Sequence, residues 1–220
     1  MQKKKAILFD YDGVLADTVN DNFQALYHAF KTHNKKIKKS DYMSLEGMSL
    51  FGIVENIGAK YGVKKIFFPE IVKEKEMFYK KHNRFRLYEG IEKLVMMLKD
   101  KNMKLAVVSG ASKERLFSAT NTSFLQLFDA IITGETVKNY KPHPDPYITA
   151  LRLLDVTSQE AIVVENAPLG IESAKSAQIF CIAFTSTLEK SYLARADMVV
   201  DTVKKLHNNL EKIIGGGELI

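Results

Sequence analysis

The chain has 220 residues, 46% of them hydrophobic, and a formal net charge of +6. This length suits one domain of ordinary size, or one core domain with a smaller insert. The single cysteine, Cys181, excludes a disulfide framework and indicates a reduced, cytoplasmic protein. The basic start is followed by too few apolar residues for a signal peptide, and no stretch approaches the ~20 apolar residues of a membrane span. We therefore expect a soluble protein without a membrane partner.

The positive charge is spread along the chain rather than gathered in one region. Lysines are dispersed, and their densest run, within residues 35–39, is typical of a solvated turn. Arginine, whose planar fork binds phosphates and base edges, is scarce. We therefore expect no nucleic-acid partner and only a mild attraction for anionic substrates. The pattern does not indicate an oligomeric state.

The first predicted element is a buried strand at residues 6–9, a short continuous apolar run. The region from about residue 19 to residue 86 has no comparable run. Its hydrophobic spacing instead predicts amphipathic helices at 20–30, 49–61 and 69–81. We therefore predict an all-helical cap domain, residues 18–87, inserted directly after the first strand.

Strands and helices alternate through the rest of the chain. Short apolar runs predict strands at 105–108, 130–132, 161–164, 180–183 and 198–200. Helical spacing predicts helices at 90–101, 112–121, 144–154 and 168–177. Such alternation is typical of an α/β fold with a doubly wound parallel sheet covered on both faces. The core domain would comprise residues 1–17 and 88–220.

Ligands of open α/β sheets collect at the carboxyl ends of the strands, and polar residues follow four of the predicted strands. They include carboxylates, a hydroxyl, an amide and a lysine: Asp10, Asp12, Ser109, Glu135, Lys141, Glu165 and Asn166. Carboxylate and amide oxygens together suggest Mg²⁺. A lysine and a hydroxyl beside them suggest a phosphoryl group.

Four motifs in chain order carry a resemblance to a known family: "DYDGVLADT", "VVSGAS", "KPHPDPY" and "VVENAPLG". The sequence resembles the haloacid dehalogenase (HAD) superfamily of phosphotransferases, in the branch with a helical cap after the first motif. It is similar to the β-phosphoglucomutase and phosphoglycolate phosphatase-like members. Each motif alone is weak, but the four together cover nearly the whole chain.

The resemblance assigns a role to each matching residue. It implies that Asp10 is the nucleophile that forms an aspartyl-phosphate, and that Asp12 is the general acid and then the general base. Ser109 would hydrogen-bond the phosphoryl oxygens, with the backbone N–H groups of Gly110 and Ala111 as an anion cradle. Lys141 would neutralise developing negative charge.

The resemblance also implies a Mg²⁺ site formed by Asp10, the Asp12 carbonyl, Glu165 and Asn166. Family members often carry two acidic residues at the last two positions, and Asn166 departs from that pattern. Its amide oxygen can still ligate Mg²⁺, but without negative charge. We therefore expect weaker Mg²⁺ binding, and tighter binding in Asn166→Asp.

Residues of the predicted cap would contribute to substrate binding. Thr18 either binds substrate or caps the first cap helix, whereas Asp17 suits a structural role at the hinge. Gly47 lies in the segment 46–49, which we expect to reach into the site. Because a cap closes over the site and excludes water, it would decide the substrate.

The residues leave three enzymatic functions and one binding function to compare. A phosphatase for a small phosphorylated metabolite is favoured, because Asp12 supplies the base that activates water. A mutase is disfavoured, because Asn22 stands near the cap histidine of similar mutases, and Leu50 or Phe51 near their basic residue. Asp12 also counts against a haloalkanoic acid dehalogenase, a branch that lacks this aspartate. A catalytically weak or inactive binding module is the remaining alternative.

Overall fold

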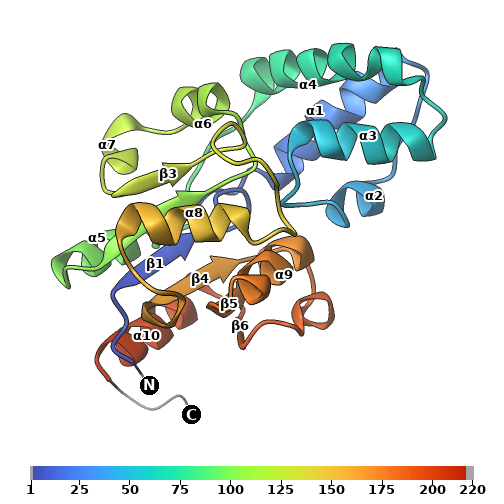
Figure 1. The fold of residues 1–220 in the computed structure, drawn as a ribbon. Coiled ribbons are helices and arrows are strands. Elements are labelled where there is room, and N and C mark those ends of the chain that lie inside the picture. The colour runs from blue at the N-terminus through green and yellow to red at the C-terminus, as the bar shows by residue number, and fades with distance from the viewer. Residues whose placement is uncertain (1, 217–220) are drawn as a thin grey trace.

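Six parallel strands form one sheet in the order β3-β2-β1-β4-β5-β6 (Figure 1). The computed structural model describes residues 2–216 of the chain. The strands are β1 Ala6–Phe9, β2 Lys104–Val108, β3 Ala130–Ile132, β4 Ala161–Glu165, β5 Phe180–Phe184 and β6 Met198–Val200. Phe9 at the end of β1 pairs with Val107 on one side and Val164 on the other. The residue that follows β1 therefore lies at the middle of the sheet's carboxyl edge.

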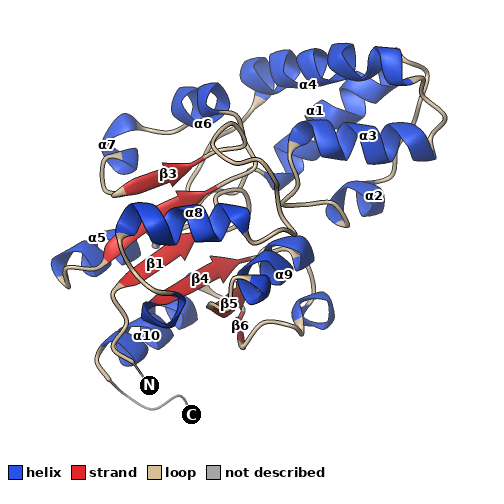
Figure 2. Ribbon diagram, in the orientation of Figure 1, coloured by secondary structure: helices blue, strands red, loops and turns tan. Residues whose placement is uncertain are grey.

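Helices cover both faces of the sheet (Figure 2). One face packs against α5 Ile91–Asp100, α6 Lys113–Ala119, α7 Thr122–Leu125 and α10 Val203–Ile214. The other packs against α8 Asp145–Leu154 and α9 Pro168–Ser176. Strand β1 supplies Ile7 and Phe9 to the first core and Ala6 and Leu8 to the second. This alternation is the two-residue period of a strand, and it confirms the predicted α/β class.

Four helices after β1 form a cap with its own hydrophobic core. They are α1 Val19–Thr32, α2 Lys39–Met43, α3 Leu50–Lys60 and α4 Phe68–His82, with a short 3₁₀ turn η1 Lys65–Phe67 before the last. The buried members of this core all come from residues 19–71. In Figure 1 the cap lies beside the carboxyl ends of the strands. The helical insert is therefore confirmed, and its limits at 18 and 87 stay a prediction.

The two chain segments that join the cap to the core run side by side. Ala16 and Leu87 form an antiparallel bridge, and the Asp17 N–H donates to the Arg86 carbonyl at 3.0 Å. The Arg86 side chain also donates to the Asp17 carboxylate through Nε at 2.8 Å. Thr18, at the N-cap of α1, makes no side-chain capping bond. Asp17 thus joins the two connections instead of capping the helix.

Three of the helices were not predicted from the sequence. Two are short: α2, which begins at Lys39 within the lysine run, and α7. The third, α10, buries Leu206, Leu210 and Ile213 on one face. Two further 3₁₀ turns, η2 Ser158–Glu160 and η3 Lys190–Leu193, connect elements of the core.

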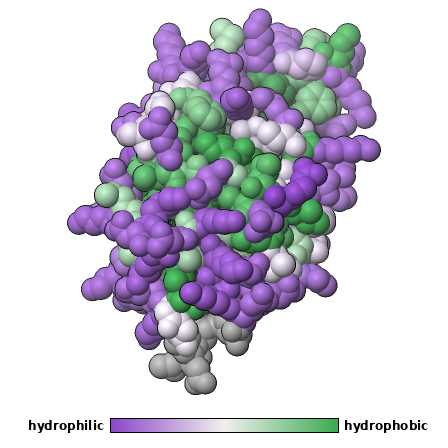
Figure 3. Space-filling view, turned by 60° about the vertical axis from the view of Figure 1, so that its left-hand side comes forward, coloured by the Kyte–Doolittle hydropathy of each residue, from purple (hydrophilic) through white to green (hydrophobic). Residues whose placement is uncertain are grey.

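Hydrophilic residues dominate the face shown in Figure 3, with hydrophobic residues reaching the surface near its middle. Across the molecule, the large hydrophobic side chains that stay exposed include Phe117 on α6 and Ile148 and Leu153 on α8. Within residues 2–216, none of the helices combines the length and apolarity that crossing a bilayer requires.

Candidate active site

Asp10 follows β1 and lies between the ends of two neighbouring strands. Its N–H donates to the Val164 carbonyl at 3.0 Å, which continues the pairing with β4. Lys141 Nζ donates to Asp10 Oδ1 at 2.5 Å and to Glu165 Oε1 at 2.7 Å. A third bond from Lys141 ends on the Val108 carbonyl at 3.0 Å. One buried ammonium therefore joins the ends of three strands, β2, β1 and β4.

Charge and burial oppose each other within this group. Burial is the largest effect on Asp10, and with the nearby Glu165 charge it outweighs Lys141 and raises the pKa of Asp10 to about 7. Burial also disfavours charge on Lys141, but Asp10 and Glu165 outweigh it and raise the pKa of that amine. An additional cation near Asp10 would favour its ionised form, which is the form that a nucleophile needs.

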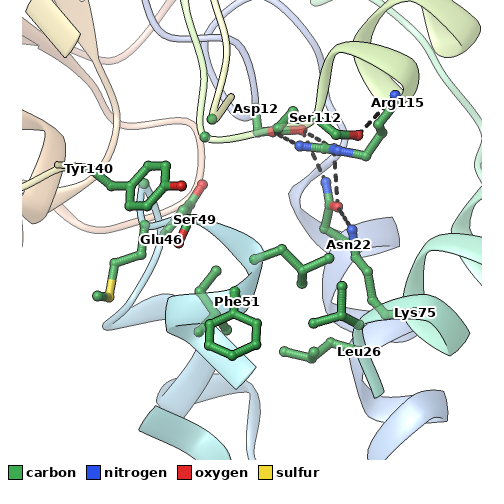
Figure 4. A pocket seen from close by; sticks show the side chains of 18 of the residues that line it. Asp12, Asn22, Leu26, Glu46, Ser49, Phe51, Lys75, Ser112, Arg115 and Tyr140 are labelled. Carbon is green, nitrogen blue, oxygen red and sulfur yellow. Dashed lines mark hydrogen bonds and ion pairs between the residues drawn. The ribbon is translucent and has the colours of Figure 1, made fainter. Parts of the chain in front are cut away.

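Asp12, two residues on, is held by groups from both domains (Figure 4). Arg115 of α6 donates to both of its oxygens, from Nη2 at 2.6 Å and from Nη1 at 3.1 Å. Thr18 Oγ1 and Asn22 Nδ2 donate to Oδ1 at 2.6 and 3.0 Å. Burial opposes ionisation of Asp12, but the Arg115 charge and these hydrogen bonds outweigh it and lower the pKa of Asp12.

A buried lysine from the cap extends this network. Lys75 of α4 donates to Asn22 Oδ1 at 2.9 Å and to Glu76 Oε1 at 2.9 Å. Burial and the nearby Arg115 charge lower the pKa of Lys75 to about 8. The Arg115 guanidinium also lies 5.3 Å from the centre of the Tyr79 ring. Arg115 and Lys75 were absent from the predicted site residues.

The sequence contained a signal for Lys75. Ile71, Lys75 and Tyr79 follow one another at four-residue spacing on α4, and all three are buried. A lysine in line with the apolar face of an amphipathic helix indicates a buried cation, which needs a functional or structural partner. The sequence contains no such signal for Arg115, because α6 is short and has no buried residues repeating at helical spacing around it.

The serine motif lies where the cap touches the core. Ser109 is buried, and its Oγ accepts from the Ala111 N–H at 3.1 Å. A Cβ at Gly110 would lie 2.7 Å from the Met48 carbonyl oxygen, so only glycine allows this approach. Gly47, with φ of +94°, comes close to Lys141. The cap segment 46–49 therefore lies against Gly110 and Lys141 of the core.

A cavity of about 250 Å³ lies between cap and core. Asp10, Asp12, Gly110, Ala111 and Gly47 line it, together with the following residues. The cap adds apolar groups such as Leu26, Leu50, Phe51 and Ile53, and the core adds Ser112, Glu135 and Tyr140. Ser109, Lys141 and Thr18 are not part of this lining. The Thr18 hydroxyl donates its hydrogen bond to Asp12 and does not line the cavity.

The oxygen donors near Asp10 suit a hard cation, with one difference from the predicted set. Both Glu165 oxygens are engaged: Oε1 by Lys141 and the Tyr147 hydroxyl, and Oε2 by the N–H groups of Asn166 and Ala167. Asn166 Oδ1, by contrast, is buried without a hydrogen-bond partner. Within residues 2–216 no three His, Cys, Asp or Glu side chains converge on one point. A cation here would therefore need the Asn166 amide oxygen beside Asp10.

Glu46, on the cap segment, contacts this amide directly. Asn166 Nδ2 donates to Glu46 Oε1 at 2.8 Å and to Thr187 Oγ1 at 3.0 Å. Burial raises the pKa of Glu46 well above its usual range; the Asn166 hydrogen bond opposes this rise, and the nearby carboxylates add to it. A carboxylate of the cap thus lies against the predicted metal ligand of the core.

Comparison with known families agrees with this geometry. Residues 7–184 match the family model described as "Haloacid dehalogenase-like hydrolase". The chain belongs to this family. The match runs from β1 to the end of β5, and so includes the helical insert and all four motifs.

Relatives and a solved structure place the chain more closely within the HAD family. Validoxylamine A 7'-phosphate phosphatase of Streptomyces hygroscopicus subsp. limoneus is 31% identical over 89% of this chain and 92% of its own length. SUPPRESSOR OF QUENCHING 1 of Arabidopsis thaliana is 29% identical over 98% of this chain, which spans only 21% of that protein. A crystal structure of β-phosphoglucomutase from Clostridium difficile superposes with a TM-score of 0.83, at 25% identity, covering 97% of this chain and 98% of that one. The chain is thus an HAD hydrolase of the β-phosphoglucomutase and phosphoglycolate phosphatase-like branch, with phosphatases among its homologues.

Proposed function

We propose that this protein is a Mg²⁺-dependent phosphatase that hydrolyses a small phosphorylated metabolite, a sugar phosphate or a phosphoglycolate-like compound. The observation that carries the proposal is the position of Asp10. Its carboxylate lines the cavity next to Asp12 while a buried lysine holds one of its oxygens. A carboxylate fixed in this way can attack phosphorus, and its neighbour can exchange the protons that the two steps require.

In the first step, Asp10 would attack the phosphorus atom of the substrate and form an aspartyl-phosphate. Asp12 would protonate the oxygen of the leaving alcohol. In the second step, Asp12, now ionised, would take a proton from water, which attacks the same phosphorus and releases inorganic phosphate. Lys141, paired with Asp10 and Glu165, would balance the negative charge on the phosphoryl oxygens.

Mg²⁺ would bind to Asp10 and Asn166 Oδ1, with the Asp12 carbonyl as a further oxygen donor. Its contribution would be Lewis-acid neutralisation of the phosphoryl charge. The support for this assignment is the buried Asn166 Oδ1, which the described residues leave without a partner. Glu165 would act through Lys141 instead of as a direct ligand, since both of its oxygens are engaged.

The cavity supports a small substrate. Its volume of about 250 Å³ lies just below the usual range for drug-sized ligands, and the cap wall around Leu50 and Phe51 is apolar. Lys75 and Arg115 add two cations near Asp12, so an anionic substrate is favoured. Ligands with a phosphoryl group and a short polar or cyclic body suit this space.

A screen of phosphorylated metabolites with added Mg²⁺, assayed by release of inorganic phosphate, tests the proposal. The screen would include p-nitrophenyl phosphate and acetyl phosphate as simple substrates, and Asp10→Asn as the control. We expect Mg²⁺-dependent release that Asp10→Asn abolishes. Absence of release from every compound would instead favour the inactive binding module.

A mutase is the second candidate function, supported by the fold that this chain shares with β-phosphoglucomutase. Asn22 occupies a position next to Asp12 where it donates a hydrogen bond but has no charge of its own. With β-glucose 1-phosphate as substrate, a phosphatase releases phosphate, whereas a mutase forms glucose 6-phosphate. Measuring both products in one reaction separates the two functions.

A further inference from the structure

Glu46 and Asn166 form a polar pair across the boundary between cap and core. Glu46 is 4% exposed and Asn166 1% exposed, and the hydrogen bond from Asn166 Nδ2 to Glu46 Oε1 is 2.8 Å long. One oxygen of each side chain, Glu46 Oε2 and Asn166 Oδ1, is buried without a partner among the described residues. Buried polar atoms rarely stay unpaired, because each one costs free energy.

The remaining contacts of Asn166 fix the orientation of its amide. Nδ2 donates its two hydrogens to Glu46 and to Thr187 Oγ1, at 2.8 and 3.0 Å. The amide oxygen is therefore the atom left free. Gly13 lies close against the same amide, since a Cβ there would come within 2.2 Å of Nδ2. A side chain so held presents one oxygen for a ligand.

We propose that Glu46 completes the metal site of this chain from the cap. By accepting from Nδ2, it holds and polarises the Asn166 amide so that Oδ1 becomes a better cation ligand, as outer partners of metal ligands do. A bound cation would also favour the ionised form of Glu46, whose carboxylate would then supply the negative charge that asparagine lacks at this position. The inference rests on the proposed function, because the cation is the Mg²⁺ proposed there.

This arrangement links the metal to the position of the cap. Glu46 belongs to the cap segment, whereas Asn166 and Asp10 belong to the core. The core therefore binds the cation more tightly when the cap is closed. By thermodynamic linkage, the cation favours the closed cap to the same extent.

The pair also changes what Asn166→Asp is expected to do. The new carboxylate would stand about as close to Glu46 Oε1 as Nδ2 does now, and two carboxyl groups so close cannot both be ionised without repulsion. The single substitution therefore gains little metal affinity, contrary to the expectation from the sequence. Affinity should rise only when Glu46→Gln accompanies it.

Mn²⁺ titration of the full chain without substrate, followed by electron paramagnetic resonance, tests the inference. We expect Glu46→Gln to weaken Mn²⁺ binding about tenfold, the low end of the usual effect of such outer partners. We expect Asn166→Asp to stay within a few-fold of the wild type, and the double variant to bind more tightly than Asn166→Asp. Glu76→Gln removes a cap carboxylate from the same cavity wall without touching Asn166, and serves as the matched control.

Unchanged Mn²⁺ affinity in Glu46→Gln, or an increase of tenfold or more in Asn166→Asp alone, would overturn the inference and leave the proposed phosphatase intact. A wild-type chain that binds no Mn²⁺ would overturn both. Circular dichroism and thermal melting without metal check that each variant folds. If Glu46→Gln does not fold, Glu46→Asp keeps the charge but shortens its reach, and we expect it to weaken binding as well; unchanged binding in that variant also contradicts the inference.

Discussion

Arg115 binds both carboxylate oxygens of Asp12, at 2.6 and 3.1 Å, with its own side chain only 9% exposed. Such a bidentate ion pair favours the ionised carboxylate. A general acid, however, must carry a proton when the substrate binds. The structure therefore holds Asp12 in the form that the second step of the proposed mechanism needs, activation of water. In that mechanism, a bound phosphoryl compound would have to loosen the ion pair for the first step.

Replacing Arg115 by methionine should raise the pKa of Asp12, because the largest effect that opposes burial is lost. The limb of the kcat/KM profile on which Asp12 loses its proton should then move to higher pH. At neutral pH, an alkyl phosphate, which needs protonation of its leaving group, should gain relative to p-nitrophenyl phosphate, by about tenfold for each pH unit that this limb moves. Arg115→Lys keeps a charge and should change this ratio less. An identical ratio in wild type and Arg115→Met would refute the assignment of Asp12 as the acid.

Asp10→Asn should abolish turnover and keep the fold. It should also change the dependence of stability on pH. The pKa of Asp10 is raised to about 7 in the folded state, so the folded protein holds its proton more tightly and loses stability as pH rises from about 4 to 7. The variant lacks this loss. In EDTA, the melting temperature of the variant minus that of the wild type should therefore increase as pH rises from about 4 to 7. A difference in melting temperature that stays the same from about pH 4 to about pH 7 would contradict the raised pKa of Asp10.

Lys75 should affect substrate binding and stability in opposite directions. Burial and Arg115 lower its pKa to about 8, so the wild-type KM for an anionic substrate should rise as pH passes 8 and the charge is lost. Lys75→Met should have a higher KM at neutral pH and no such rise. Because the unfolded chain keeps the proton up to about pH 10, the charge destabilises the fold most below pH 8. Lys75→Met should therefore melt at a higher temperature than the wild type at pH 7, and this difference should shrink above pH 8. Lys73→Met, which removes a lysine from the same helix, is the control.

Gly110→Ala should keep the cap from closing fully. The added Cβ would lie 2.7 Å from the Met48 carbonyl oxygen, a distance that backbone atoms must move to relieve. We expect a higher KM, a larger radius of gyration by X-ray scattering, and melting close to that of the wild type. Met48→Leu changes the side chain but leaves the carbonyl contact, so it should leave the scattering profile unchanged. A Gly110→Ala variant as compact as the wild type would show that the contact is not needed for closure.

The sequence was sufficient for the sheet because the central strands are buried on both faces and each strand reads as a short apolar run. All six strands appear within one or two residues of their predicted limits. Because the strands are parallel, the polar residues that follow them lie at one edge of the sheet, where Lys141 donates a hydrogen bond to Asp10. Helix α10 was missed although Leu206, Leu210 and Ile213 repeat with helical spacing, because the chain there is rich in charged and amide residues.

The long-range contacts of the site could not be predicted from the sequence, because they depend on how distant segments of the chain meet. Arg115 reaches Asp12 from a helix more than 100 positions away, and Glu46 reaches Asn166 across 120. No local period or motif records such a pair. The departure at Asn166 was visible, but its partner was not, and the expected effect of Asn166→Asp changed once Glu46 was found beside it.

The bridge between Ala16 and Leu87 has a consequence for how this protein could be rebuilt. The chain leaves the core and returns to it at adjacent positions, held by backbone hydrogen bonds on both sides of the bridge. A tight turn could therefore replace the whole cap without stretching the core, and caps of other sizes could be spliced in at the same neck at little entropic cost. Exchange of the helical piece would leave the strand ends and Lys141 in place, whereas the hydrogen bonds that join Thr18, Asn22 and Glu46 to the core would have to be rebuilt in each new cap.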